Sequence, residues 1–137
     1  MKIRRPIGLL SGILVAMTAI SIAWAQGGGF NKPVFDDAME GTGKAARIAF
    51  GGLIGGDLSK VSAQVKTIAA TEVKLREMQP PQSAEKIAEF KANADSLAAR
   101  AKRVADAADG KKTALAAHEF GGMLETCVNC HAVFRKD

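Results

Sequence analysis

The chain has 137 residues and carries 19 Lys and Arg against 14 Asp and Glu, a formal net charge of +5. Three of the basic residues and none of the acidic ones lie within residues 1–25, so the 112 residues that follow are nearly neutral, at +2. This balance gives no support to nucleic-acid binding, which needs a clustered basic face with aromatic residues, and the length suffices for one domain but not two.

Residues 1–25 have the pattern of a secretory signal peptide. A basic stretch (Lys2, Arg4, Arg5) precedes an apolar run (Ile7 to Ile22) and an A-x-A cleavage motif (Ala23 to Ala25). The apolar run is near the lower length limit for a membrane span, so an uncleaved membrane anchor is the alternative. We therefore expect a mature domain at residues 26–137 that is exported to a bacterial periplasm, with membrane association only if the signal is not cleaved.

From Lys32 onward the hydrophobic pattern is helical, because Ala is abundant and no segment alternates with a period of two. Apolar residues recur at spacings of three and four along four segments. These segments are residues 33–54, 58–77, 84–108 and a last one from about residue 111 nearly to the end. The pattern predicts an all-α fold, an antiparallel four-helix bundle. Many of its inner residues are Ala or Gly, too small to fill the interior alone.

Short segments with turn and capping residues separate the four expected helices. A glycine cluster at residues 51–56 ends the first helix and forms a turn, not a phosphate-binding loop, because no strand precedes it. The other expected boundary residues are Asp57 and Ser83 as N-caps, Pro80 and Pro81 in the second connection, and Asp109 and Gly110 after the third helix. The apolar stripe of the second helix has one polar exception, Glu72.

Residues 127–131 have the sequence C-V-N-C-H, the signature of covalent c-type haem attachment. Each thiol adds to one vinyl group of a porphyrin, and the imidazole that follows supplies an axial nitrogen to the iron. A thioredoxin-type dithiol would need a βαβ context, and a structural zinc site would need two more ligands. Only one other histidine, His118, exists in the chain. We predict one covalent haem c, attached to Cys127 and Cys130 with His131 as proximal iron ligand.

The C-x-x-C-H motif coincides with the expected inner stripe of the fourth helix. That stripe consists of Thr113, Ala117, Phe120, Leu124, Cys127, His131 and Phe134. The coincidence predicts that His131 projects into the bundle. His118 is about 20 Å from His131 along the helix axis and lies off the stripe, so we expect it in solvent.

Met39 is the candidate for the distal iron ligand. The other methionines are excluded by the signal peptide (Met1, Met17), the proline connection (Met78) or the helix that holds His131 (Met123). The expected inner stripe of the first helix is Phe35, Met39, Thr42, Ala46, Ala49 and Leu53. Because the first helix begins near where the fourth ends, Met39 and His131 should lie at similar depth; the alternative is an ordinary core methionine. Gly41 and Gly43 each cost about 1 kcal/mol in a helix, which suggests the close approach of a flat group.

The pattern C-x-x-C-H-x-x-F-R at residues 127–135 of an Ala-rich, four-helix chain resembles the class II cytochromes c, the cytochrome c′ family. The resemblance implies that Phe134 and Arg135 lie near the haem, with Arg135 as partner of a propionate. Low-spin members carry a Met on the first helix and shuttle electrons, whereas high-spin members leave the iron open to NO or CO. Met39 favours the low-spin type. Members are often homodimers, although no exposed stripe in this sequence argues for one.

We therefore expect a periplasmic monohaem electron carrier that cycles between Fe(III) and Fe(II) with an unidentified redox partner protein. It is not expected to be an enzyme, because no acid–base pair stands at motif spacing and the scattered Asp and Glu are typical of solvated helix faces. One alternative is a high-spin protein that binds NO or CO at an open distal site. The other is a non-haem exported helical adaptor with a plain Cys127–Cys130 pair.

Overall fold

The computed structural model describes residues 30–78 and 83–135, which form four helices. These are α1 (Lys32–Gly55), α2 (Leu58–Leu75), α3 (Ala84–Asp109) and α4 (Thr113–Phe134). The all-α prediction is confirmed, with helix bounds within two residues of those expected. The signal peptide and the Pro80-Pro81 connection lie outside the described residues. Within them, no helix is long and apolar enough to cross a membrane.

The helix ends follow from local chemistry. Side chains of Asp57 and Ser83 accept hydrogen bonds from backbone N–H groups three residues further on, at 3.0 and 3.3 Å, which confirms both as N-caps. Asn31 caps α1 in the same way, at 3.2 Å, and was not predicted. The predicted turn at the glycine cluster is shorter than expected, because α1 continues through Gly51 and Gly52 to Gly55. Gly56, with a φ of +74°, ends α1 in the left-handed conformation that glycine adopts most readily.

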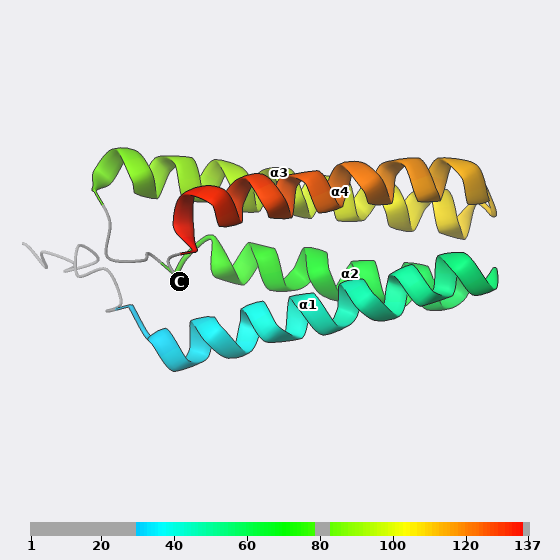
Figure 1. The fold of residues 1–137 in the computed structure, drawn as a ribbon, viewed down its shortest axis with the longest axis horizontal. Coiled ribbons are helices and arrows are strands. Elements are labelled where there is room, and N and C mark those ends of the chain that lie inside the picture. Colours follow the sequence, from blue (N-terminus) through cyan, green and yellow to red (C-terminus); the bar gives the residue numbers. More distant parts are fainter. Residues whose placement is uncertain (1–29, 79–82, 136–137) are drawn as a thin grey trace, which may run out of the picture.

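The four helices run alternately up and down and form two pairs in Figure 1, α1 with α2 and α3 with α4. The start of α1, the end of α2, the start of α3 and the end of α4 all lie at one end of the bundle. Met39 and the C-x-x-C-H motif are therefore in the same half of the molecule, as the chain order predicted. The α1–α2 and α3–α4 turns lie at the opposite end.

The hydrophobic core is centred on α2 and α3. Most of the predicted inner residues of both helices are buried there, whereas the predicted Leu58 and Ile87 are only half-buried. The buried ones are Val61, Val65, Ile68 and Leu75 of α2 and Phe90, Ala94, Leu97, Ala101, Val104 and Ala108 of α3. Helix α1 contributes only small residues to full burial, namely Thr42, Ala45, Ala49 and Gly52. A Cβ on Gly52 would lie 3.0 Å from a methyl carbon of Val61, so this glycine permits close packing of α1 on α2.

The predicted inner stripe of α4 is wrong at several positions. The buried residues are Ala116, Phe120, Met123 and Thr126, whereas Thr113, Ala117 and Leu124 of the predicted stripe are exposed. Helix α4 packs extensively on α3 and barely touches α1, so it is turned by about one residue toward α3. In α1 the shift has the same cause, since α1 packs on α2: Ala45 and Gly52 are fully buried and the predicted Ala46 and Leu53 only half-buried.

Candidate functional site

A cavity of about 200 Å³ lies in the half of the bundle where α1 begins and α4 ends. All four helices line it, and the lining residues are Met39, Thr42, Gly43 and Ala46 of α1, Glu72 of α2, Phe90, Asn93, Ala94 and Leu97 of α3, and Leu124, Thr126, Cys127, Cys130 and His131 of α4. The structure thus brings the predicted distal residue Met39 together with both cysteines and His131. These four residues line the same cavity, although Met39 and Cys127 are 88 positions apart in the sequence.

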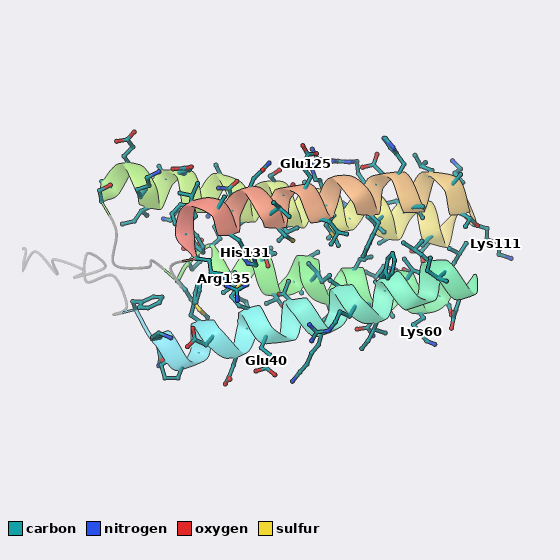
Figure 2. All side chains as sticks on the ribbon, in the orientation of Figure 1. Glu40, Lys60, Lys111, Glu125, His131 and Arg135 are labelled. Atoms are coloured by element: carbon teal, nitrogen blue, oxygen red, sulfur yellow. The ribbon has the colours of Figure 1, made fainter. Side chains whose placement is uncertain are left out.

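Helix α4 supplies both thiols and the imidazole on successive turns. Residues three and four apart share a helix face, so Cys127, Cys130 and His131 can line one cavity. Both cysteines are free, half-buried thiols, and His131 is more exposed. In Figure 2, His131 lies on the side of α4 toward α1, whereas Glu125 of the same helix projects away from the bundle. His131 therefore borders this cavity, but it is exposed and is not buried inside the bundle as the predicted inner stripe implied.

Helix α1 contributes one half-buried sulfur and several small residues. Met39 is half-buried, and Gly43 and Ala46 follow it along the cavity wall. A Cβ on Gly43 would meet no atom closer than the Arg47 guanidinium, 4.0 Å away, so the wall has open space at this point. Gly41 is exposed and does not line the cavity. The predicted close approach of a flat group can therefore apply to Gly43 but not to Gly41.

Glu72, the polar exception on the apolar stripe of α2, also lines the cavity. It is only 4% exposed, and its one hydrogen bond in the structure comes from the Thr42 hydroxyl, at 3.5 Å, which is long for such a bond. Burial raises the pKa of Glu72 to about 7, against a smaller lowering by the Thr42 hydrogen bond. The sequence feature that could have marked Glu72 as a functional residue is its place on the apolar stripe of α2, because a buried Glu without a charged partner is rare.

The electrostatics of the two thiols bear on the dithiol alternative. Burial, with a further contribution from the nearby Glu72 carboxylate, raises the pKa of both Cys127 and Cys130 to about 11. Redox-active dithiols have lowered thiol pKa values, because the thiolate is the nucleophile. In the described part of the chain there is also no strand, and no group of three or more His, Cys, Asp or Glu that could hold a metal ion.

The two residues implied by the family resemblance have different positions. Phe134 is half-buried and packs edge-on against Phe90 of the cavity wall, with ring centroids 5.5 Å apart and an interplanar angle of 79°. Phe35 of α1 adds a third ring, 5.9 Å from Phe90. Arg135 is exposed, follows the last turn of α4 and does not line the cavity.

The other residues considered as ligands lie elsewhere. Met123 is fully buried in the core and away from the cavity, and His118 is exposed, as expected. Met78 does not line the cavity either.

The donor set fits a covalently attached haem. Two cysteines, a histidine and a methionine from another helix line one cavity, and most of its exposed wall is apolar. The cavity is smaller than the roughly 300–1,000 Å³ of typical cofactor sites. A haem would therefore have to extend between α1 and α4, the neighbouring helices with the fewest mutual contacts.

Comparisons with protein-family models, with curated proteins and with solved structures found no match to this chain. The functional interpretation therefore depends on the sequence motif and on the geometry of the cavity.

Proposed function

We propose that this chain is an exported monohaem c-type cytochrome that carries electrons, of the low-spin type that its resemblance to the cytochrome c′ family implies. The observation that carries the proposal is the convergence of Met39, from α1, with Cys127, Cys130 and His131, from α4, on one cavity. A dithiol or an adaptor protein would account for the cysteines but gives no reason for a methionine in the lining of the same cavity. A bound haem c would supply the Fe(III)/Fe(II) couple.

The residues proposed to bind the haem have different roles. Cys127 and Cys130 hold the cofactor through thioether bonds, and His131 binds the iron from α4. The Met39 sulfur binds the iron from α1 and, as a soft ligand, favours the reduced state and raises the reduction potential. Apolar neighbours such as Leu97 limit the access of water, which also raises the potential. Arg135 is available at the rim of the bundle as a counter-charge for a carboxylate.

Covalent attachment is tested by expressing the full chain with a c-type maturation apparatus and purifying the exported protein. We expect a coloured protein whose haem stays with the chain on a denaturing gel, detected by peroxidase staining. Cys127→Ala combined with Cys130→Ala should abolish the staining. A colourless wild-type protein would overturn the proposal and favour the adaptor alternative.

Distal ligation is tested by Met39→Ala, with Met123→Leu as the matched control because Met123 is fully buried outside the cavity. We expect Met39→Ala to convert the oxidised iron from low to high spin and to let the reduced protein bind CO. Met123→Leu should leave the spectrum unchanged. If Met39→Ala has the spectrum of the wild type, Met39 is not a ligand and the gas-binding alternative takes precedence.

A further inference from the structure

Glu72 has no part in the attachment or ligation proposed above, yet it is the one carboxylate among the residues that line the cavity. Its side chain is almost completely buried, and within the described part of the chain its only hydrogen bond is the long one from Thr42. A buried carboxylate with a single weak donor is poorly stabilised compared with one in water. In the folded protein such a group is either a neutral acid or an anion with a raised pKa.

Among the described residues, no Lys or Arg lines the cavity beside Glu72, and Arg76, one turn further along α2, is paired with Asp95 at 2.8 Å. The α1 residues across the cavity are uncharged, α3 contributes Asn93 and Phe90, and α4 contributes the two thiols and the titratable His131. The carboxylate of Glu89, on α3, acts on Cys130 and is itself paired with Lys86 at 2.7 Å. The charge of the cofactor is therefore the main positive charge that Glu72 would meet.

We propose that Glu72 takes up a proton when the protein accepts an electron, so that the two are carried together. This inference rests on the proposed electron-carrier function. Glu72 gains one proton from solvent and becomes a neutral carboxyl group as one electron from the donor protein converts Fe(III) to Fe(II). It returns the proton to solvent when the electron leaves.

The physical cause is the loss of one positive charge from a cavity of low dielectric constant. Charges a few ångströms apart interact several-fold more strongly there than in water, so reduction of the iron favours the protonated form of Glu72. By thermodynamic linkage, protonation of Glu72 favours reduction by the same free energy. The raised pKa of Glu72, about 7 in the chain alone, places this exchange in the physiological range.

The test is the midpoint potential of the haem-loaded protein between pH 5 and 9. A proton exchanged with each electron lowers the potential by about 59 mV per pH unit, the one-electron equivalent of a tenfold change in concentration. We expect this slope over part of the range in the wild type and a flat profile in Glu72→Gln. Glu125→Gln is the matched control, because Glu125 is exposed on the helix that holds the haem motif, and it should keep the wild-type slope.

A second variant and a second measurement keep the test independent of how well Glu72→Gln loads haem. Thr42→Val removes the hydrogen bond that lowers the pKa of Glu72, so the sloped region should move to higher pH. Infrared difference spectra of the wild type should show a protonated carboxyl band that appears on reduction. A merely structural role for Glu72 predicts neither effect.

The outcomes separate this inference from the proposed function. A correctly ligated, coloured protein whose potential is flat from pH 5 to 9 would overturn the role of Glu72 and leave the electron-carrier function standing. An unchanged slope in Glu72→Gln would also overturn it, because another group would then exchange the proton. A colourless protein would overturn both.

Discussion

The α2–α3 and α1–α4 interfaces differ in how completely their apolar side chains are buried. Between α2 and α3, side chains such as Ile68 and Val104 interlock and are fully buried. Between α1 and α4, Phe50 is 54% exposed and Leu124 is 39% exposed, although both lie on helices with regular apolar spacing. The first interface holds the fold together, and the second separates two helices around the cavity that contains the proposed ligands. The proposed ligands thus come from the looser interface, although α2 and α3 also line the cavity through Glu72, Phe90 and Leu97.

The largest expected effect comes from removing the attachment residues, because the haem can then no longer fill the space between α1 and α4, whereas the α2–α3 contacts remain. We expect the haem-free Cys127→Ala/Cys130→Ala protein to retain helices but to lose a sharp thermal transition, because small residues under-fill its interior. Circular dichroism during heating measures this. A sharp, cooperative transition in that variant would show that the protein core is sufficient without a cofactor.

Truncation of one large apolar side chain in each interface compares their contributions directly. Ile68→Ala, in a residue 1% exposed, should cost about 2–5 kcal/mol, because it removes buried area and leaves a cavity. Leu124→Ala should cost less than about 1 kcal/mol, because its side chain already meets solvent. Urea unfolding of both variants gives the free energies. Equal losses would contradict the division between the two interfaces.

Glu72→Gln should make stability less dependent on pH. The pKa of Glu72 is about 7 in the folded chain and near 4.5 as a free side chain, so the folded state binds more protons between these values. Its contribution is complete below pH 4.5 and is lost as pH rises to about 7, by about 3 kcal/mol in all.

The variant should therefore match the wild type near pH 4.5 and exceed it in stability at pH 8. Urea unfolding at both pH values, with the iron kept reduced, measures the difference. An advantage of Glu72→Gln that is the same at both pH values would show that its carboxyl does not titrate in this range.

Substitution of two glycines of α1 by alanine should have effects of opposite sign. In Gly52→Ala the new Cβ would lie 3.0 Å from Val61 and 3.1 Å from the Asp57 carbonyl oxygen, so about 1–3 kcal/mol should be lost. In haem-free protein Gly43→Ala meets open space and should raise the helix content measured by circular dichroism, because Ala is favoured over Gly in a helix by about 1 kcal/mol. The same substitution should weaken the haem-loaded protein if the cofactor packs on Gly43. A gain in both forms would place the cofactor away from this wall.

Much of the site could be predicted because it depends on local chemistry. The C-x-x-C-H spacing places two thiols and an imidazole along one helix whatever that helix packs against. Chain order alone put Met39 at the depth of His131. Glu72 was visible only as an exception on an apolar stripe, because its proximity to Cys127 depends on how α2 faces α4 across the bundle. No pattern within one helix carries that information.

The amino-acid sequence by itself determined four helices, their ends and the residues available as ligands, since hydrogen-bonded turns and caps involve neighbours a few positions apart. Only the tertiary structure decided the rotation of α1 toward α2 and of α4 toward α3. This rotation leaves Met39 of α1 and Leu124 and His131 of α4 at the wall of a cavity. The physical reason is that a helix presents several apolar faces, and the one it buries is set by the volume of side chains on the helix beside it.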